Sequence, residues 1–274
     1  AVQYANERRQ GRAIGAPAGE QSLIVEHPDV RRPLTTQRAW IDAMRALTYT
    51  NAAFLDMAKA ATDTEAARSW REKADLYIPL SKSLCTDVAQ ECTSSAVQIF
   101  GGMGYVEETG VAQHYRDARI LPIYEGTNGI QAADLVGRKL GMRSGGVVHD
   151  ELDRFESMLD DVAKVDGMAA AAENMRQAIS SSREATEHLV SVASNDPASL
   201  LASSTPYLRM LGTTVCAGLL AGSVIGLDAS NEFEAAKIAS ARFFCEQLLP
   251  AARGWASAVK MSSETLYAIP ADAF

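Results

Sequence analysis

Residues 64–102, TEAARSWREKADLYIPLSKSLCTDVAQECTSSAVQIFGG, decide the fold class of this chain. From about residue 65 to residue 100, apolar side chains recur at the three- and four-residue steps of a helix. Gly101 and Gly102 end the pattern, because glycine readily takes the left-handed conformation that closes many helices. Pro79 is the one interruption, and we expect it to bend the helix or to end its first segment. The stretch predicts a long helical pattern rather than a sheet.

The rest of the chain carries the same helical character. Its nine prolines leave long proline-free windows, at 34–78, 80–121, 123–196 and 207–249. Alanine is abundant, valine and isoleucine are scattered, and no segment alternates strictly between apolar and polar residues. We therefore predict an all-α protein.

Apolar spacing also predicts the individual helices and a domain boundary. We expect helices at 34–61, 65–100, 111–118, from Thr127 or Asn128 to about 140, and at 148–164, 167–194, 198–226 and 231–260. The stretch Gly141–Gly146 has three glycines in six positions and Met142 as its only core-forming residue. We place a linker at 141–147, between a helical bundle at 1–140 and a second helical domain at 148–274.

Composition and charge exclude several classes of function. With 274 residues, 47% of them hydrophobic, the chain is long enough to bury a sizeable core. A net charge of −8 argues against a nucleic-acid surface, which requires concentrated Lys and Arg. The longest apolar run, 215–227, is shorter than a membrane span and is broken by glycines. We expect an acidic, soluble, cytoplasmic protein with no nucleic-acid partner and no transmembrane segment.

Standard motifs for metals and nucleotides are missing from the sequence. The four cysteines form no CxxC pair, and we expect them to be buried thiols in a reducing compartment. The four histidines are far apart in sequence, so we expect no metal site. The glycines of 101–104 follow a helix instead of a strand and lack a third spaced glycine, which makes a dinucleotide-binding fold a poor interpretation.

One carboxylate, that of Glu125, lies in an unusual setting. It stands between an apolar and aromatic approach, Ile120–Tyr124, and the Gly-Thr start of a helix. A carboxylate there can be partly desolvated, and desolvation favours the neutral form, which suits a general base. A position near a helix N-terminus also favours an acidic side chain without any catalytic role. Composition and spacing leave both interpretations open.

Three linked motifs resemble the C-terminal half of the acyl-CoA dehydrogenase family in order and spacing. They are AVQIFGGMGY at 96–105, YRDAR at 115–119 and IYEGTNGIQ at 123–131. The opening YANERRQ at 4–10 resembles the segment by which the family's chain enters its C-terminal helical bundle. The resemblance covers about residues 1–140. The longer tail is similar to the extended bacterial branch of the family, which includes 3-methylmercaptopropionyl-CoA dehydrogenases and appends another helical domain.

The resemblance implies roles for particular residues. Glu125 would remove the α-proton of an acyl-CoA thioester while the flavin of FAD takes a hydride from the β-carbon. Arg8 would meet the FAD pyrophosphate, where a guanidinium can pair with phosphate oxygens. The implied cofactor-binding residues are Arg8, Gln98, Gly102 and Thr127, and the implied substrate-binding residues are Tyr124 and Gly126.

Two positions depart from the family pattern. Gly129 stands where the family often has Gln, which removes one polar contact to the cofactor, and Gly11 replaces a common Phe. We therefore expect the FAD geometry to differ from that of the family.

The resemblance also implies partners and further parts. We expect an FAD-dependent oxidoreductase of fatty acid metabolism that acts on acyl-CoA, passes electrons to an acceptor such as an electron-transfer flavoprotein, and forms a homodimer or higher homo-oligomer. Complete family members add an N-terminal helical domain and a β-domain, so we expect this chain to be a C-terminal fragment or one partner of a split enzyme, inactive alone. The open alternative is a non-catalytic helical module for oligomerisation or partner docking.

Overall fold

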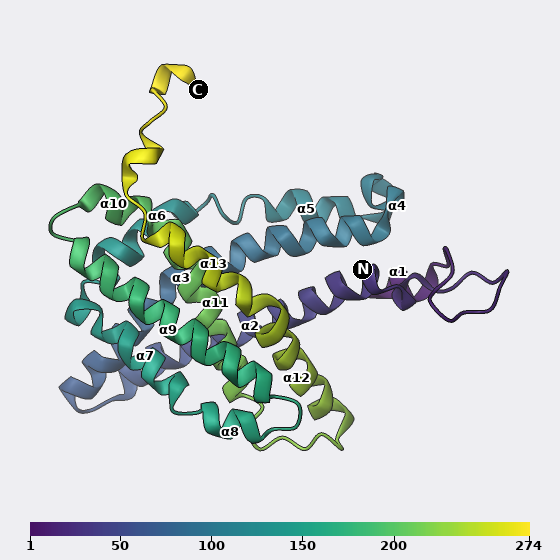
Figure 1. The fold of residues 1–274 in the computed structure, drawn as a ribbon, viewed down its shortest axis with the longest axis horizontal. Helices are drawn as coiled ribbons and strands as arrows, with labels where there is room; N and C mark the ends of the chain where they lie inside the picture. The colour runs from purple at the N-terminus through teal and green to yellow at the C-terminus, as the bar shows by residue number, and fades with distance from the viewer.

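The computed structural model describes residues 1–274 and consists of helices and their connections (Figure 1). Its one extended pairing is an isolated antiparallel bridge between Arg9 and Leu23. The prediction of an all-α protein is therefore confirmed. No helix combines the length and the apolar character that crossing a membrane requires.

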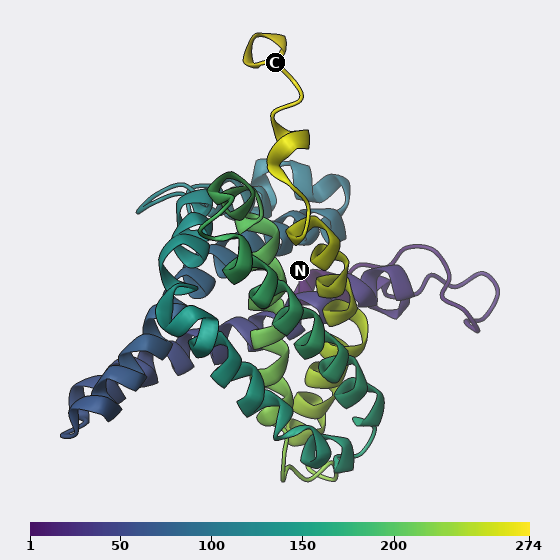
Figure 2. The same ribbon diagram turned by 60° about the vertical axis from the view of Figure 1, so that its left-hand side comes forward.

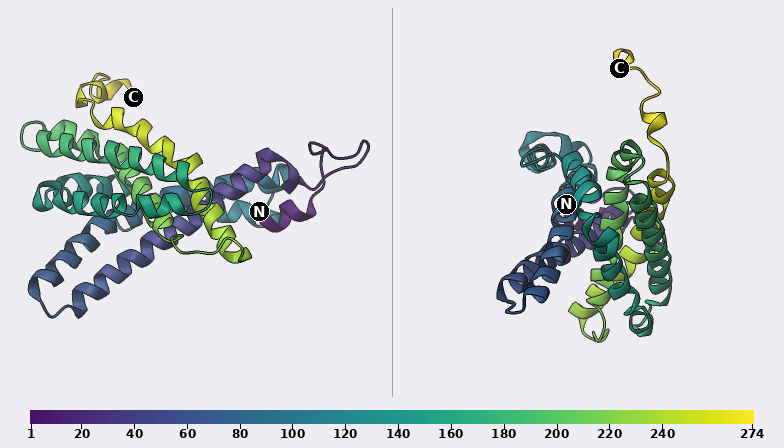
Figure 3. Two further views of the ribbon diagram at one scale, coloured as in Figure 1. Left: turned by 60° about the horizontal axis from the view of Figure 1, so that its bottom comes forward. Right: turned by 90° about the vertical axis from the view of Figure 1, so that its left-hand side faces the viewer.

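Two long neighbouring helices, α2 (Pro28–Ala60) and α3 (Thr64–Phe100), organise the first half of the chain. The Asp63 side chain caps α3 by accepting a hydrogen bond from the backbone N of Ala66 at 2.8 Å. The turn between the helices projects from the body (Figure 3, left). Gly101 ends α3 as its position in the sequence predicts, but its φ of 62° and ψ of −140° lie outside the left-handed helical conformation expected for such a cap.

Prolines do not interrupt these two helices. The helix α2 begins at Pro28 and not at 34, because proline is favoured in the first helical position, and it continues through Pro33. Likewise, α3 continues through Pro79, so of the two expected effects of Pro79, a bend or the end of a segment, the second is wrong. An interior proline costs about 3 kcal/mol. Burial of its neighbours Leu76 and Leu80, both 0% exposed, offsets that cost.

Short elements follow α3 and lead back along the bundle. The chain passes through α4 (Gly102–Tyr105) into α5 (Val111–Ala118), whose bounds match the prediction. After a loop, α6 (Asn128–Asp134) continues into a π-helical turn at Leu135–Lys139, which confirms a helical segment up to about residue 140. The N-terminal α1 (Val2–Glu7) is fixed to the end of α3, since the rings of Tyr4 and Phe100 stack with centroids 4.2 Å apart.

The second half is a set of packed helices around α11. The predicted helix 167–194 is found as α9, whereas the predictions at 148–164 and 198–226 each divide in two, and the prediction at 231–260 is interrupted by a π-helical turn at Phe244–Leu248. Ser203 marks one of these divisions, because its hydroxyl donates to the carbonyl of Val259 at 2.7 Å. The helices are α7 (Gly146–Glu156), α8 (Leu159–Lys164), α9 (Ala169–Val192), α10 (Pro197–Ala202), α11 (Ser204–Gly222), α12 (Glu232–Phe243) and α13 (Leu249–Val259).

A single apolar core runs from α2 to α13. The helix α11 lies at its centre, and glycines on α11 make room for its neighbours. A Cβ at Gly212 would lie 3.0 Å from Leu84 of α3, and one at Gly218 would lie 2.4 Å from the ring of Phe155 of α7. Residues on both sides of 141–147 therefore share one core. The stretch itself contributes a short 3-10 turn, Met142–Gly145.

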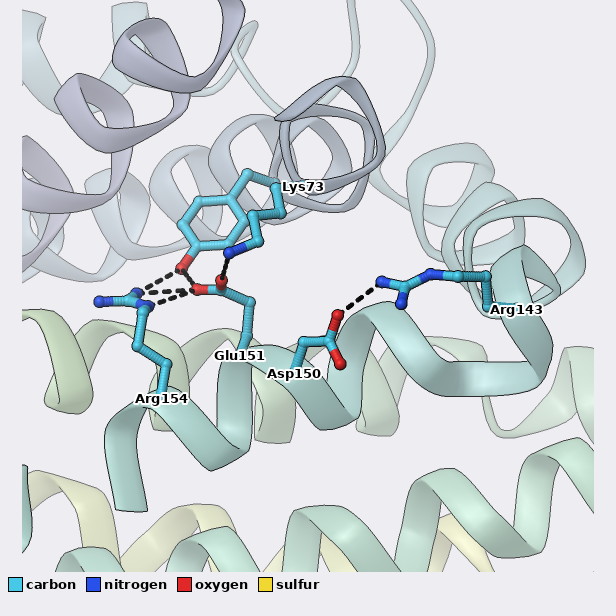
Figure 4. A network of polar contacts seen from close by, with 6 residues as sticks. Lys73, Arg143, Asp150, Glu151 and Arg154 are labelled. Carbon is cyan, nitrogen blue, oxygen red and sulfur yellow. Dashed lines mark hydrogen bonds and ion pairs between the residues drawn. The ribbon is translucent and has the colours of Figure 1, made fainter. Parts of the chain in front are cut away.

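A buried ionic network joins α3 to α7 (Figure 4). The carboxylate of Glu151, 1% exposed, accepts hydrogen bonds from the hydroxyl of Tyr77 at 2.8 Å and from the Arg154 guanidinium at 2.8 Å. The ammonium of Lys73 lies 3.2 Å from its other oxygen. Burial works to raise the pKa of Glu151, but Arg154, Tyr77 and Lys73 outweigh it and hold that pKa below its ordinary value. All the charged partners of Glu151 come from this chain, although the oxygen nearest Lys73 accepts no hydrogen bond.

The four cysteines are free thiols. Cys216 and Cys245 are buried, and Cys85 and Cys92 are half-buried. Burial raises the pKa of Cys85 and of Cys245 to about 12, and that of Cys92 to about 11. Thiols held protonated in this way are poor nucleophiles.

Besides the α2–α3 turn, two further segments project from the helical body (Figure 2). One is the loop that follows α1 and returns to the body at the 3-10 turn Ile24–Glu26. The other is the C-terminal tail after α13, where Tyr267 and Phe274 are 75% and 90% exposed. Both extend into space that the rest of this chain does not fill.

Candidate functional site

The loop between α5 and α6 carries the glutamate that the sequence singles out. Its backbone is closed by two hydrogen bonds, from Tyr124 N to the carbonyl of Ile120 at 3.1 Å and from Asn128 N to the carbonyl of Pro122 at 3.0 Å. At the turn of this loop, Glu125 has a φ of 52° and Gly126 a φ of 84°. Positive φ is uncommon for a residue with a Cβ and disfavours it by roughly 1–2 kcal/mol. The closed loop holds Glu125 in a backbone conformation that is disfavoured for an unconstrained glutamate.

The side chains around Glu125 are open to solvent in this chain. Tyr124 is 49% exposed and Ile123 is 46% exposed, and Glu125 itself is exposed. The partial desolvation expected for Glu125 is therefore not found here. The reason is that no element of these 274 residues covers the outer face of the loop.

Thr127 is the helix cap that the sequence suggests. Its hydroxyl oxygen accepts a hydrogen bond from the backbone N of Ile130 at 3.4 Å, which satisfies one free donor at the start of α6. Thr127 also lines a groove beside the loop, together with Asp87, Gln90, Arg119, Pro122, Ile123, Asn128 and Gly129. The capping role does not exclude a contact with a ligand in this groove.

Asn128 holds the loop to α3, a role that sequence reasoning missed. Its side-chain amide donates to the carboxylate of Asp87 at 2.6 Å and to the carbonyl of Ser83 at 3.1 Å. Its side-chain oxygen accepts from the ammonium of Lys82 at 2.9 Å. The sequence offered one indication, because Asn128 stands at a helix start, but a cap and a tertiary contact look alike there.

A second groove lies at the other end of α3 and contains two of the predicted cofactor residues. Arg8 and Gln98 both line it, next to Gly101. The hydrogen bond from Ile24 N to the carbonyl of Arg8 at 2.8 Å fixes the chain on the opposite wall. The other lining residues are Tyr4, Gln10, Ile24, His27, Asp29, Val30, Ile99 and Phe100.

The polar groups of this groove are available to a ligand. Arg8 is exposed and forms no salt bridge within the chain, and the side chain of Gln98 makes no hydrogen bond in it. A Cβ placed on Gly101 or Gly102 would meet nothing within 4 Å, so the backbone there is open to close approach. An unpaired guanidinium beside an open glycine pair suits a phosphate-bearing ligand.

Gly11, beside the same groove, has a φ of 68°, and a Cβ there would lie 3.5 Å from the ring of His27. The left-handed backbone accounts for a glycine at a position where Phe is common, since a large side chain would be strained in this conformation.

The structure thus divides the predicted site into two groups. Tyr124, Gly126 and Thr127 accompany Glu125 on the loop, whereas Arg8, Gln98 and Gly102 lie near the end of α3. The loop is attached to α3 at Asp87, and Gln98 comes eleven residues later, which is about 16 Å along a helix. Neither of the two grooves contains both groups.

A third groove, with a volume of about 480 Å³, lies between α3, α6, α11 and α13. Asp87, Asn128 and Gly129 line both this groove and the one beside the loop. A Cβ on Gly129 would meet only the hydroxyl of Thr127, at 3.9 Å, so the glycine leaves open space where a larger side chain would stand. The helices of the second half therefore reach the back of the Glu125 loop.

Comparison with known families identifies both halves of the chain. Residues 1–140 match the model described as acyl-CoA dehydrogenase, C-terminal domain, and residues 150–270 match the model described as acetyl-CoA dehydrogenase C-terminal like.

Characterised relatives include dehydrogenases of acyl-CoA thioesters. The 3-methylmercaptopropionyl-CoA dehydrogenase of Ruegeria pomeroyi is 40% identical over 263 residues, which are 91% of this chain and 43% of that protein. A butyryl-CoA dehydrogenase of Syntrophomonas wolfei is 29% identical over 287 residues, which are 100% of this chain and 46% of that protein. This chain spans less than half the length of these relatives.

Solved structures share the fold at low identity. The structure of Caenorhabditis elegans ACDH-11 in complex with C11-CoA matches with a TM-score of 0.70 and 18% identity, over 97% of this chain and 42% of that one. Acyl-CoA oxidase3 from Yarrowia lipolytica matches with a TM-score of 0.67 and 17% identity, over 97% of this chain and 42% of that one. The arrangement of all the helices is thus found in larger proteins.

Proposed function

This chain belongs to the acyl-CoA dehydrogenase family, and we propose that it supplies the C-terminal helical portion, with the catalytic base Glu125, of an FAD-dependent acyl-CoA dehydrogenase. The conformation of Glu125 carries the proposal. A loop that is closed on itself and attached to α3 holds an exposed carboxylate in a disfavoured backbone conformation. Such strain clusters at functional sites. Arg143 and Ser144 also have positive φ, so the conformation of Glu125 supports the proposal together with the family motif around it.

The chemistry required of Glu125 is the transfer of one proton. Its carboxylate would take the α-proton of the acyl-CoA thioester, while FAD, when bound, would accept a hydride from the β-carbon. Loss of these two hydrogens leaves an α,β-double bond conjugated with the thioester carbonyl. The substrate and the missing parts of the enzyme would cover the loop, and that cover would supply the desolvation that a general base requires.

The residues of the second groove fit the cofactor. Arg8 offers an unpaired guanidinium for the pyrophosphate, and Gln98 offers a free amide next to the open backbone of Gly102. Thr127 lies with Glu125 and would contact the flavin side instead. Because the two groups are separate, we propose that they serve two FAD molecules related by a dimer, with Arg8, Gln98 and Gly102 reaching the cofactor of the partner copy.

The loop side chains would meet the substrate. Tyr124 and the backbone of Gly126 flank Glu125, and the exposed Ile123 adds an apolar surface for an acyl chain. The named relatives act on 3-methylmercaptopropionyl-CoA and butyryl-CoA, so these two thioesters are the first substrates to compare. Electrons would leave through an acceptor such as an electron-transfer flavoprotein.

The test is Glu125→Gln in enzyme that also contains the N-terminal and middle portions that its relatives carry. Removing a general base lowers the rate of flavin reduction by acyl-CoA by about 10²–10⁴-fold, with FAD content unchanged. Glu108→Gln, which alters another exposed glutamate, is the matched control and leaves the rate unaffected. Flavin reduction that survives Glu125→Gln would remove Glu125 from this role.

The same preparation distinguishes the alternative. We expect the 274 residues alone to bind FAD weakly and to be inactive. If the assembled wild-type enzyme also binds no FAD and turns over neither thioester, the chain is a non-catalytic helical module for oligomerisation or docking.

A further inference from the structure

We propose that Asn128 is a positioning residue, whose side-chain amide fixes the loop of Glu125 to α3 by joining two opposite charges. The inference rests on the proposed function of Glu125. It concerns a residue that makes no contact with the reacting atoms.

The side chain of Asn128 attaches the loop to α3 through hydrogen bonds to two charged residues. Its side-chain oxygen lies 2.9 Å from the ammonium of Lys82, and its side-chain nitrogen lies 2.6 Å from the carboxylate of Asp87. Hydrogen bonds to ionised groups are shorter and roughly twice as strong as those between neutral groups. Neither Lys82 nor Asp87 has a salt-bridge partner in the chain, so both charges are directed to the same amide.

The two charges also fix which way the amide points. An oxygen accepts and an NH₂ group donates, so only one of the two amide orientations satisfies both Lys82 and Asp87. Ser83 and Thr86 add contacts on the same side, with Ser83 accepting from the amide nitrogen at 3.1 Å. These α3 residues lie four apart in two pairs and therefore share one face of the helix.

The attachment of Asn128 to α3 also restrains Glu125, because the two residues belong to the same closed loop. Its own backbone N closes the loop by donating to the carbonyl of Pro122 at 3.0 Å, and Glu125 lies inside the segment so closed. Glu125 has a positive φ within this closed segment, a conformation that an unconstrained residue with a Cβ disfavours. If the side chain of Asn128 is released, the carboxylate of Glu125 loses its fixed position.

The second half of the chain supports the same attachment. Asn128 and Asp87 are half-buried and line the groove whose opposite wall is formed by Arg209 of α11 and Trp255 of α13. These helices limit the access of water to the amide, which would otherwise compete for its hydrogen bonds. This gives α11 and α13 a role in holding the loop in addition to their role in the core.

Asn128→Asp tests the inference directly. The introduced carboxylate keeps the contact with Lys82 but meets the Asp87 carboxylate without a donor. We expect the backbone amides of 123–127 to exchange hydrogen at least about tenfold faster in the chain without cofactor. In FAD-loaded enzyme we expect kcat to fall by about 10–100-fold, with KM and FAD content nearly unchanged, since misplacement of a reacting group mainly affects the rate of chemistry.

A double variant separates positioning from general damage. Combining Asn128→Asp with Asp87→Asn exchanges the two groups, so that the introduced amide again donates to a carboxylate that Lys82 still contacts. We expect the double variant to regain most of the loop protection and most of kcat. Asp87→Asn alone keeps the shape and removes one charge, and it serves as the milder variant if Asn128→Asp does not fold.

Asn174→Asp is the matched control. Asn174 of α9 is also a half-buried amide that donates to another segment, the carbonyl of Cys245 at 3.2 Å, but it is remote from the loop in sequence and element. Its substitution lowers stability without faster exchange at 123–127.

The outcomes separate this inference from the proposed function. Wild-type loop protection and kcat in Asn128→Asp overturn the positioning role, as does a double variant no better than the single one. If Glu125→Gln abolishes flavin reduction while Asn128→Asp preserves it, only the positioning role fails. If Glu125→Gln preserves flavin reduction, the proposed function fails, and the exchange data alone decide whether Asn128 holds the loop.

Discussion

Glu151 of α7 and Glu125 of the α5–α6 loop are glutamates in opposite surroundings. Glu151 is 1% exposed, and Tyr77, Arg154 and Lys73 surround its carboxylate. Glu125 is exposed, and no donor of this chain reaches it. The backbone shows the reverse contrast, because Glu151 lies in a regular helix whereas Glu125 has a φ of 52°.

The two carboxylates differ in whether this chain supplies partners for the charge. At Glu151 the charged partners come from α3 and α7 of this chain, so the network links these two helices. At Glu125 the backbone is disfavoured and the chain supplies no partner for the charge, which is the arrangement that the proposed role as a base requires. The substrate proposed above is such a partner.

Glu151→Gln removes the charge of the buried glutamate, and we expect the largest change in the free energy of unfolding from it. It leaves Arg154 and Lys73 without the carboxylate that neutralises them, and removing one member of a buried ion pair costs about 3 kcal/mol. Urea unfolding of the chain measures the loss. Asp150→Asn is the control, because its pair with Arg143 is 46% and 43% exposed and contributes less than about 0.5 kcal/mol. Equal losses in both variants would contradict the contrast between a buried and an exposed pair.

The pH dependence of that loss follows from the lowered pKa of Glu151 in the folded state. A carboxyl whose folded pKa lies below its unfolded value, here near 4.5, stabilises the fold fully above that value. The contribution disappears as pH falls through the folded pKa. The difference in unfolding free energy between wild type and Glu151→Gln should therefore be constant from about pH 7 to 5 and shrink below about pH 4.5. A difference that grows on acidification would show that the network does not favour the charged form.

Tyr77→Phe removes a single hydrogen bond of the same buried network, and we expect a smaller loss of stability from it. It removes the hydroxyl that donates to Glu151 at 2.8 Å and keeps the ring that packs edge-on against Phe54. Loss of one hydrogen bond to a charged group costs about 1.5 kcal/mol. Urea unfolding at neutral pH measures it. A loss as large as that of Glu151→Gln would mean that the Tyr77 hydroxyl, and not the charges of Arg154 and Lys73, carries most of the network's contribution.

Local features of the chain could be predicted from the sequence. The end of α3 at Gly101, the bounds of α5 and the cap at Thr127 depend on residues within a few positions. Periodicity therefore reveals them without knowledge of the tertiary fold. The family motifs gave the candidate residues around Glu125 in the same way.

Features that depend on distant segments could not be predicted. Pro79 interrupts the local pattern, but burial supplied by other helices keeps α3 continuous through it. Glu151 stands on the apolar stripe of α7 with Val148 and Leu152, and a charge on such a stripe was an indication that was missed. The desolvation expected for Glu125 needs a cover that this chain does not provide.

Glu125→Gly tests the backbone strain at the exposed glutamate, and we expect the smallest change in the free energy of unfolding from it. Glycine takes a positive φ without the cost of roughly 1–2 kcal/mol that a Cβ incurs, but it gives up about 0.5–1 kcal/mol in unfolded-state entropy. The net result is a chain more stable by about 0.5 kcal/mol, although the proposed base is gone. Glu108→Gly, at a glutamate without positive φ, has only the entropy term and loses up to about 1 kcal/mol. Urea unfolding of the two variants side by side measures whether the Glu125 conformation costs stability, because only a residue with a strained backbone gains from substitution by glycine. If Glu125→Gly destabilises the chain as much as Glu108→Gly does, the loop conformation stores no strain, and the observation that carries the proposed function loses its force.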